Sequence, residues 1–116
     1  MTEQPMIRVE AAKSFIRNLC TLAKKYRRIY QDVQPIIEQL QSAEIIGDQI
    51  PNVGYAVFKV RIRNSDIQKG KSGGYRLIYY LQTVDGIILL SIYPKSEQAN
   101  IDTDEIKAII EQETSG

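Results

Sequence analysis

Apolar residues recur at three- and four-residue steps in two neighbouring stretches near the start of the chain. The first set, after Ala11, is Phe15, Ile16, Leu19, Leu22, Ala23 and Tyr26; the second is Val33, Ile36, Ile37 and Leu40. This spacing is typical of amphipathic α-helices. Asp32 is a plausible cap for the second helix, and Pro35 is tolerated only in a first turn. The pattern therefore predicts a helical hairpin.

The period changes to strict alternation between Tyr55 and Arg63. Apolar Phe58, Val60 and Ile62 alternate there with Lys59, Arg61 and Arg63. A strand with this pattern carries three cations on one face. Two further strands are predicted over residues 75–82 and 87–93, joined by Asp85-Gly86, a strong signal for a two-residue hairpin turn. Together the three strands form an antiparallel meander.

The remaining segments complete the expected architecture. Met6 to Val9 is either an edge strand or a direct lead into the first helix, and residues 43–54 are expected to form a loop with turns. Asp102-Thr-Asp-Glu105 resembles a capping box at the start of a short acidic helix. The expected fold class is α+β, with an N-terminal helical hairpin packed on a small antiparallel β-sheet and a short C-terminal helix. Residues 1–116 are expected to form one domain.

Charge is strongly segregated along the chain, although the 116 residues carry a formal net charge of only +1. Residues 11–30 carry +6 with no acid, residues 59–76 carry +5, and residues 97–116 carry −5. A charged partner responds to the local field rather than to the sum. The two basic segments therefore predict a polyanionic partner.

The residue inventory excludes several kinds of chemistry. The chain has no histidine, which excludes a histidine general base and a catalytic triad. Its single cysteine, Cys20, cannot form an internal disulfide and is expected to be a small buried residue on the first helix. Neither a secretory signal nor a membrane-spanning run is present, so we expect a cytoplasmic protein that needs no cofactor or metal.

A glycine-rich basic segment, Lys69-Gly-Lys-Ser-Gly-Gly-Tyr-Arg76, leads into the second strand of the meander. Lys and Arg meet phosphate oxygens, and glycines let the backbone approach a ligand closely. A nucleotide-binding phosphate loop does not fit, because Ser65 stands where its first glycine is required and a strand follows instead of a helix. The alternatives are a patch for a polyanion, which would include Lys59 and Arg61, and a merely solvated basic face.

Four tyrosines, Tyr75 in this segment and Tyr79, Tyr80 and Tyr93 after it, could stack on bases of a single-stranded nucleic acid. Alternation places Tyr75 and Tyr79 on the face opposite Arg76, so Tyr79 is expected in the core. Tyr80 shares the face of Arg76. For Tyr93, at a strand end beside Lys95, core and functional roles both stay open.

These features together resemble the RelE/ParE superfamily of bacterial toxins, and most closely its HigB-like branch. The resemblance covers nearly the whole chain and is carried by Phe58-Lys-Val-Arg61, the segment from Lys69 to Arg76, and Tyr93-Pro-Lys-Ser-Glu97. It implies a RelE-like microbial RNase fold, cleavage of messenger RNA on the ribosome, and a cognate antitoxin as protein partner. The superfamily also contains ParE-like gyrase inhibitors, and an inactive binding module of the same fold is a further alternative.

The resemblance also implies roles for individual residues. Lys69 and Lys71 match the family's basic positions and would supply a general base or a phosphate ligand. Arg76 would stabilise the transition state, and Tyr93 or Lys95 would protonate the leaving group. The expected RNA-binding residues are Lys59, Arg61, Arg63 and Tyr80. Ser96, Gln98 and Asn100 stand where some members carry a further arginine, tyrosine or histidine.

Overall fold

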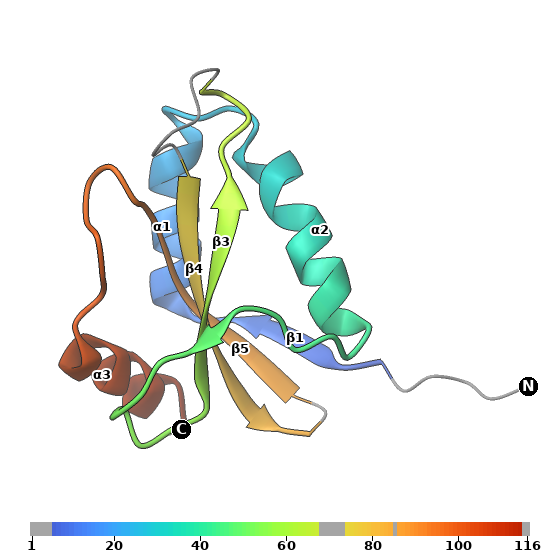
Figure 1. Ribbon diagram of the computed structural model, residues 1–116, viewed down its shortest axis with the longest axis vertical. Helices are drawn as coiled ribbons and strands as arrows, with labels where there is room; N and C mark the ends of the chain where they lie inside the picture. Colours follow the sequence, from blue (N-terminus) through green and yellow to red (C-terminus); the bar gives the residue numbers. More distant parts are fainter. Residues whose placement is uncertain (1–5, 68–73, 85, 115–116) are drawn as a thin grey trace, which may run out of the picture.

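A computed structural model describes residues 6–67, 74–84 and 86–114 (Figure 1). Its elements, in chain order, are β1 (Arg8–Ala11), α1 (Lys13–Ala23), α2 (Ile29–Gln41), β2 (Asp48–Gln49), β3 (Val57–Arg63), β4 (Gly74–Thr83), β5 (Gly86–Pro94) and α3 (Thr103–Thr114). The five strands form one sheet in the order β1-β5-β4-β3-β2. The α+β class and the meander of β3, β4 and β5 are confirmed.

The sheet is mixed because its two edges differ from the central meander. β1 is an edge strand that pairs parallel with β5. This confirms the first of the two alternatives for Met6 to Val9, an edge strand. β2 is a two-residue strand that pairs antiparallel with Lys59 and Phe58 of β3. It lies within the stretch expected to be a loop. Thr83 pairs with Gly86, so Gly86 belongs to β5 and not to the hairpin turn predicted at Asp85-Gly86; residue 85 lies outside the described residues.

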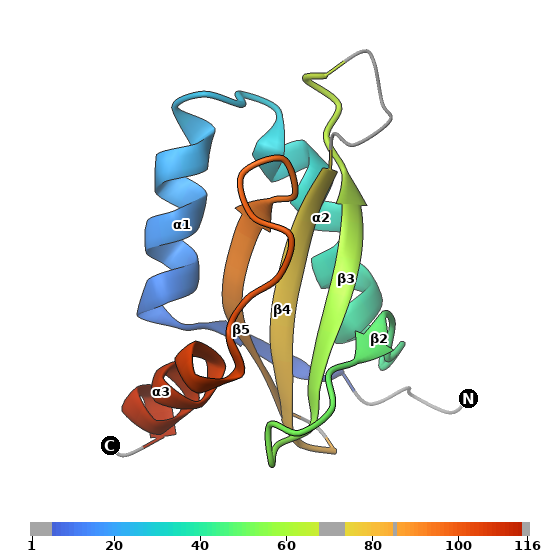
Figure 2. The ribbon, with the colours of Figure 1, turned by 60° about the vertical axis from the view of Figure 1, so that its left-hand side comes forward.

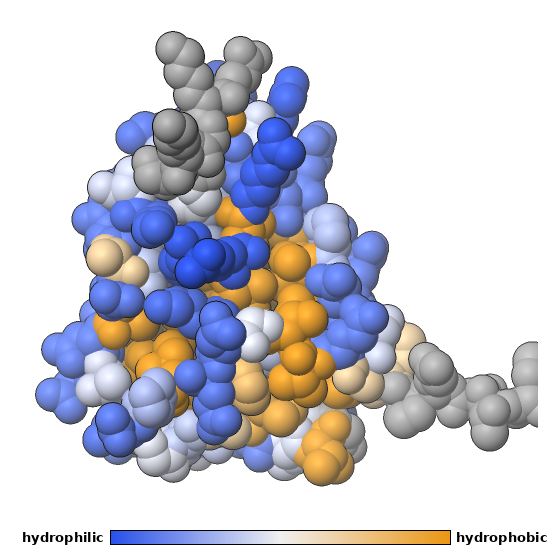
Figure 3. All heavy atoms as spheres, in the orientation of Figure 1, coloured by the Kyte–Doolittle hydropathy of each residue, from blue (hydrophilic) through white to orange (hydrophobic). Residues whose placement is uncertain are grey.

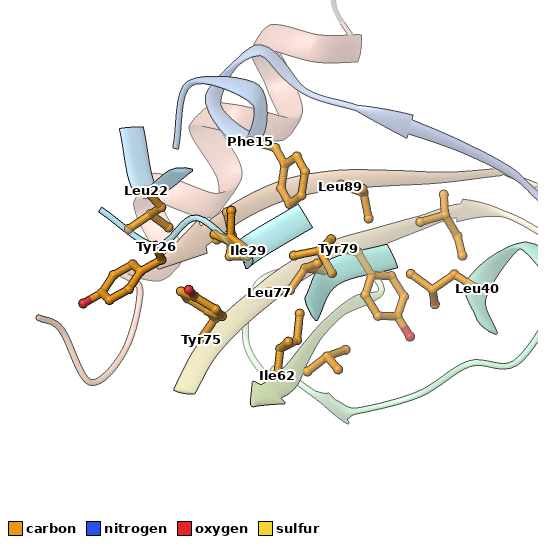
Figure 4. Packing of buried hydrophobic residues seen from close by; sticks show 14 of the residues in the cluster. Phe15, Leu22, Tyr26, Ile29, Leu40, Ile62, Tyr75, Leu77, Tyr79 and Leu89 are labelled. Atoms are coloured by element: carbon orange, nitrogen blue, oxygen red, sulfur yellow. The ribbon is translucent and has the colours of Figure 1, made fainter. Parts of the chain in front are cut away.

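Both N-terminal helices cover one face of the sheet and form the larger core with it. Phe15 and Leu22 of α1 and Ile29 and Leu40 of α2 pack there against sheet residues. These are Val60, Ile62, Tyr75, Leu77, Tyr79, Ile87, Leu89 and Ile92. Figure 4 shows Tyr75, Leu77 and Tyr79 pointing from β4 toward the helices. The expectation that Tyr79 belongs to the core is therefore confirmed.

The second helix begins earlier than its apolar pattern indicated. Ile29 is fully buried and starts α2, so Asp32 lies in the first turn and is not the cap. Asp32 instead accepts a hydrogen bond from the Ser65 amide at 2.9 Å. Pro35 consequently lies beyond the first turn, and because proline has no N–H it deprives the Gln31 carbonyl of its helical partner. Core burial of Ile29 outweighs this local cost.

The outward side of α1 also corrects one expectation. Cys20 is exposed, because it lies on the side of the helix opposite buried Phe15 and Leu22. Ile16, counted with the apolar positions, is 49% exposed. The apolar side of α1 is therefore narrower than the sequence pattern indicated.

The other face of the sheet carries a smaller core under α3 (Figure 2). Ile106 and Ile110 of α3 are fully buried against Ile78 and Leu90, and Ile101 joins them from the preceding segment. Asp102 caps the helix, since its Oδ1 accepts the Asp104 amide at 3.1 Å. α3 thus covers only part of this face, and the rest carries the charged residues described next.

Candidate functional site

One row of polar side chains crosses the three central strands on the face partly covered by α3. Arg61 of β3 pairs in register with Arg76 of β4, and Arg76 pairs with Tyr93 of β5. Directly opposed side chains on one face of a sheet have Cβ atoms about 5 Å apart. The tertiary fold therefore brings together three residues that the sequence separates by up to 32 positions.

Arg76 is the buried cation of this row, with 7% of its surface exposed. Its Nη1 donates to the Tyr75 carbonyl oxygen at 3.2 Å. Within residues 6–67, 74–84 and 86–114 the only ion pairs are Arg8–Glu10 and Lys25–Glu97, so no carboxylate neutralises Arg76. Burying a charge without a partner is costly, and a bound phosphate would offset that cost. The row therefore has the character of an anion site.

Gly74 makes room for the arginine at the start of β4. A Cβ at this position would lie 2.9 Å from the Ile62 carbonyl oxygen and 3.5 Å from Nη1 of Arg76. The sequence pattern assigned this glycine to ligand approach or to a turn. The geometry gives it a packing role as well, because a side chain would push β3 away and crowd the guanidinium.

Tyr93 occupies the third position of the row and is only 5% exposed. Its hydroxyl is buried and has no hydrogen-bond partner among the residues that the structure describes. Burial raises the pKa of Tyr93; the Arg76 charge partly offsets this, and Glu105 of α3 reinforces it. The phenol therefore stays protonated at neutral pH and can donate a proton or a hydrogen bond. Tyr93 also packs in the core under α3, which confirms the core role; its functional role stays a prediction.

The other cations expected in the site lie around this row. Arg63 is exposed at the end of β3, and Lys95 is exposed with its amide donating to the Gly74 carbonyl at 2.8 Å. Lys59 is partly buried, and its Nζ donates to Oδ1 of Asn100 at 3.3 Å. Figure 3 shows hydrophilic side chains gathered over β3 and β4, beside an apolar strip that runs between β3 and α2.

Among the described residues expected in the site, Tyr80 is not brought to the row. Tyr80 pairs with Val57, four residues along β4 from Arg76, and its ring packs edge-on against Tyr55 with centroids 5.4 Å apart. It lies on the same face but toward the other end of the strand. Lys69 and Lys71 lie outside the described residues.

Two residues that sequence reasoning did not assign to the site contact it. Asn100 holds Lys59, and Glu105 influences the Tyr93 phenol from the first turn of α3. Both come from the chain after β5, which crosses the face of the sheet (Figure 2). The sequence marked Asn100 only as standing where some family members carry a further arginine, tyrosine or histidine, and it accounted for Glu105 by helix capping alone.

The described residues contain no group of three or more Cys, Asp or Glu placed to hold a metal ion. No helix in this part of the chain is long and apolar enough to cross a bilayer. In and around the polar row the described residues supply guanidinium, ammonium and phenol groups, which bind and protonate phosphate oxygens.

Comparison with known proteins agrees with this arrangement. No curated protein matches the chain closely enough to count as a relative. A family model described as the RelE toxin of the RelE/RelB toxin-antitoxin system matches residues 17–115, which include α2, α3, the central strands and the whole polar row. With that match, and with an α+β fold that presents a basic sheet face, the chain belongs to the RelE toxin family.

Proposed function

We propose that this chain is a HigB-like toxin that cuts messenger RNA on the ribosome by attack of a ribose 2′-hydroxyl on the adjacent phosphate. The observation that carries the proposal is the row Arg61–Arg76–Tyr93, in which a buried guanidinium lacks a carboxylate and adjoins a protonated phenol. Such a reaction requires positive charge at the phosphate and a proton for the leaving 5′-oxygen. The row supplies both.

Arg76 would stabilise the charge that develops on the scissile phosphate. Its planar guanidinium can bind two phosphate oxygens at once, and its burial reduces screening by water. Arg61 and Arg63, exposed on β3, would bind the neighbouring phosphates, and Lys59 would extend this track toward Tyr80. The RNA would therefore run along β3 and β4.

Two groups are candidates for the proton donor. Lys95 is exposed, and its backbone amide donates to the Gly74 carbonyl, so its side chain is open to a bound RNA. Tyr93 directly adjoins Arg76, but its hydroxyl is buried under side chains that include those of α3. Lys69 or Lys71 would serve as base, which requires neighbouring cations to lower the lysine pKa from its reference value of about 10.4.

Transcript-end mapping after induction in growing cells tests this proposal. Wild-type protein is expected to produce discrete cuts within codons, and Arg76→Ala to reduce them by about a hundredfold or more. Arg8→Ala, which removes an exposed arginine on β1, serves as the matched control and should cut normally. Intact transcripts combined with DNA damage would overturn the RNase assignment in favour of gyrase inhibition.

The two proton donors are separated by a second comparison. If Lys95 donates, Lys95→Ala abolishes cleavage and Tyr93→Phe leaves most of it; the reverse result assigns the donor to Tyr93. Single-turnover rates on ribosome-bound messenger RNA measure this directly. Lys69→Ala and Lys71→Ala are then compared as single variants. If one of these lysines is the base, only the variant that lacks it should lose cleavage.

A cognate antitoxin is the protein partner that membership of the family implies. We propose that it places acidic and apolar side chains over the row and the adjacent apolar strip. Such a segment would neutralise Arg61 and Arg63 while covering the apolar atoms beside them. Co-purification of the Arg61→Glu/Arg63→Glu variant with the antitoxin should then be reduced relative to wild type.

A further inference from the structure

β5 does not keep one regular alternation along its length. Ile87 and Leu89 face the two N-terminal helices in the larger core, and Ile92 belongs to the same core. Leu90 and Tyr93 belong to the smaller core on the other face. Side chains of a regular strand return to the same face at every second residue. Leu89 and Ile92 are three residues apart, so the strand changes phase between them.

The pairing of β5 with β4 locates this change at Leu90. Leu89 pairs with Tyr79 and Ser91 pairs with Ile78, so Leu90 has no partner in β4. One extra residue opposite a continuous strand is a β-bulge, and it redirects the side chains that follow. Bulges of this kind are frequent next to active sites. The bulge in β5 comes shortly before the residue that completes the polar row.

The hydrogen bonds at the edge of β5 show the same irregularity. The Leu89 carbonyl accepts the Ala12 amide at 2.8 Å, and the next carbonyl, that of Leu90, accepts the Ser14 hydroxyl at 2.6 Å. Successive carbonyls of a regular strand point to opposite edges. Two that point to the same edge therefore mark the bulged position.

The bulge decides which residue of β5 lies opposite Arg76. If the register before the bulge continued, Arg76 would face Ile92, and Tyr93 would face Tyr75 on the side covered by the helices. The extra residue shifts the register by one, and a shift of one residue exchanges the two faces. Tyr93 is thereby placed opposite Arg76. Lys95 also follows the bulge, so both candidate proton donors depend on it for their positions.

Two polar side chains of α1 hold the bulged conformation. The pairing of β1 ends before the bulge, and from there α1 runs beside β5 (Figure 2). Ser14 donates to the Leu90 carbonyl. Asn18, one turn further along α1, accepts the Ser91 hydroxyl at 3.0 Å and the Ile92 amide at 3.4 Å, both at its Oδ1. Polar groups buried without a partner are costly, so these hydrogen bonds favour the bulged strand.

We propose that Ser14 and Asn18 are positioning residues of the RNA-cleaving site, because they hold the bulge that places Tyr93 and Lys95 against Arg76. This assignment rests on the proposed function, since it concerns the reaction that the row would perform. Both residues act through the β5 backbone and not through contact with RNA. Asn18 carries more of the effect, because its oxygen accepts two hydrogen bonds whereas Ser14 donates one.

Core packing alone is the competing explanation for the bulge. Without the bulge, Ser91 would face Leu77 in the larger core, and Ile92 would leave that core. Burial of a serine hydroxyl among apolar side chains opposes an unbulged strand whatever α1 contributes. If packing alone fixes the register, loss of the hydrogen bonds from α1 should leave the row and its activity unchanged.

Substitution of Asn18 separates the two explanations. Asn18→Ala removes the acceptor and raises helix propensity, so α1 itself is not weakened. Asn18→Asp keeps an oxygen at the same position and should still accept both hydrogen bonds. Thr21→Ala, which shortens an exposed polar side chain on the same helix, is the matched control. Ser14→Ala, which removes one hydrogen bond, takes the place of Asn18→Ala if circular dichroism shows that the latter is unfolded.

The activity test measures the single-turnover rate on ribosome-bound messenger RNA at saturating protein, and the binding of an RNA that 2′-O-methylation protects from cleavage. Asn18→Ala is expected to cut about tenfold more slowly or worse and to bind RNA as wild type does, because misplaced donors slow the reaction without changing the basic surface. Asn18→Asp and Thr21→Ala should cut at nearly the wild-type rate. Normal cutting by Asn18→Ala would overturn the inference, and so would equal losses in Asn18→Ala and Asn18→Asp.

Backbone contacts measured by nuclear magnetic resonance keep this inference separate from the proposed function. Asn18→Ala should weaken the nuclear Overhauser contacts between Arg76 and Tyr93, which lie after the bulge, and preserve those between Tyr79 and Leu89, which lie before it. A slower rate with all contacts unchanged would also overturn the inference, because Asn18 would then act by another route.

The two proposals fail in different measurements. If the wild-type chain cuts no messenger RNA, but Asn18→Ala loses the contacts between Arg76 and Tyr93 and Asn18→Asp restores them, the RNase assignment fails and the role of Asn18 in placing Tyr93 stands. If the wild-type chain cuts messenger RNA, and Asn18→Ala changes neither the rate nor the contacts, the positioning role fails alone.

Discussion

Arg76 and Tyr93 show how the fold buries two polar side chains next to each other. Arg76 is a buried cation whose guanidinium donates to the Tyr75 backbone carbonyl, and Tyr93 is a buried phenol whose ionisation is disfavoured. Each is costly to the folded state, since burial removes hydration that the protein does not fully replace. Costs of this kind persist in proteins where function requires them. A substitution at Arg76 or Tyr93 can therefore change activity and stability in opposite directions.

Replacing Arg76 by methionine should therefore raise stability while abolishing activity. Methionine fills similar space without a charge, so we expect the free energy of unfolding to increase by about 1 kcal/mol. Urea denaturation measures this change, and transcript-end mapping should show no cuts. Arg76→Lys, which keeps the charge but loses the planar fork, serves as the comparison. A large loss of stability in Arg76→Met would instead identify Arg76 as a structural residue.

The buried tyrosines of the larger core make the protein less stable as the pH becomes alkaline. Burial raises the pKa of Tyr79 from 10.0 to about 12, and its hydroxyl donates to the Ile46 carbonyl at 2.6 Å. The protonated form is favoured in the folded state, so the contribution of Tyr79 is complete below pH 10 and is lost as the pH rises toward 12. We expect unfolding free energies measured at pH 9 to 11.5 to fall less steeply in Tyr79→Phe. An unchanged slope would contradict this assignment.

At the scale of elements, the short strand β2 depends on one glycine. Gly47 has a φ of +92°, and a Cβ there would overlap the Lys59 carbonyl of β3. Gly54 also has a positive φ, +85°, but a Cβ there would meet no atom within 4 Å. A side chain at Gly54 would therefore meet backbone strain alone, whereas a side chain at Gly47 would meet both backbone strain and steric overlap.

Gly54→Ala is therefore expected to cost about 1–2 kcal/mol through backbone strain alone, and Gly47→Ala clearly more. Thermal unfolding of both variants provides the comparison. The extra loss in Gly47→Ala should come with faster exchange of the Ile50 amide, which donates to the Val57 carbonyl beside β2. Equal losses in the two variants would show that the contact with β3 is relieved without cost.

For the whole molecule, charge segregation decides which surfaces attract RNA. The acidic C-terminal segment forms α3, next to the face that carries the polar row. Exposed carboxylates at this distance reduce the attraction of a polyanion at low salt and are screened at high salt.

Neutralising Asp104 and Glu111, both exposed on α3, should tighten RNA binding a few-fold at low ionic strength. The effect should vanish near 1 M salt, where the Debye length is about 3 Å. Glu38→Gln/Glu44→Gln adds the same charge near the end of α2, on the other side of the sheet, and should change binding less. A gain that persists at high salt would indicate a local structural change in place of an electrostatic one.

Much of the fold could be predicted because its signals are local. The apolar periods of α1 and of β3 each lie within a dozen residues, and the Asp102 cap acts on its own helix. The predicted start of α2, with Asp32 as its cap, was wrong because the burial of Ile29 depends on the sheet that this residue packs against. Exposure of Cys20 was missed for a similar reason, since the width of a buried helix face is set by its neighbours.

The candidate site was predictable in its chemistry but not in its arrangement. Arg76 and Tyr93 were named from residue type and resemblance, yet nothing in the sequence placed them side by side or buried them. Tyr80 was named for the same site and lies four residues along the strand, packed against Tyr55. Two further residues, Asn100, which accepts a hydrogen bond from Lys59, and Glu105 of α3, whose charge raises the pKa of Tyr93, were not assigned to the site from the sequence.

The sequence by itself determined which segments become helices and strands, which faces are basic, and that no histidine chemistry takes part. These properties depend on residue type and short-range period, so they can be read along the chain. Only the tertiary structure decided the parallel edge strand, the register of Arg61 with Arg76 and Tyr93, and the bulge at Leu90 that brings Tyr93 into that register. These depend on contacts between distant residues, whose energies are set by packing and burial.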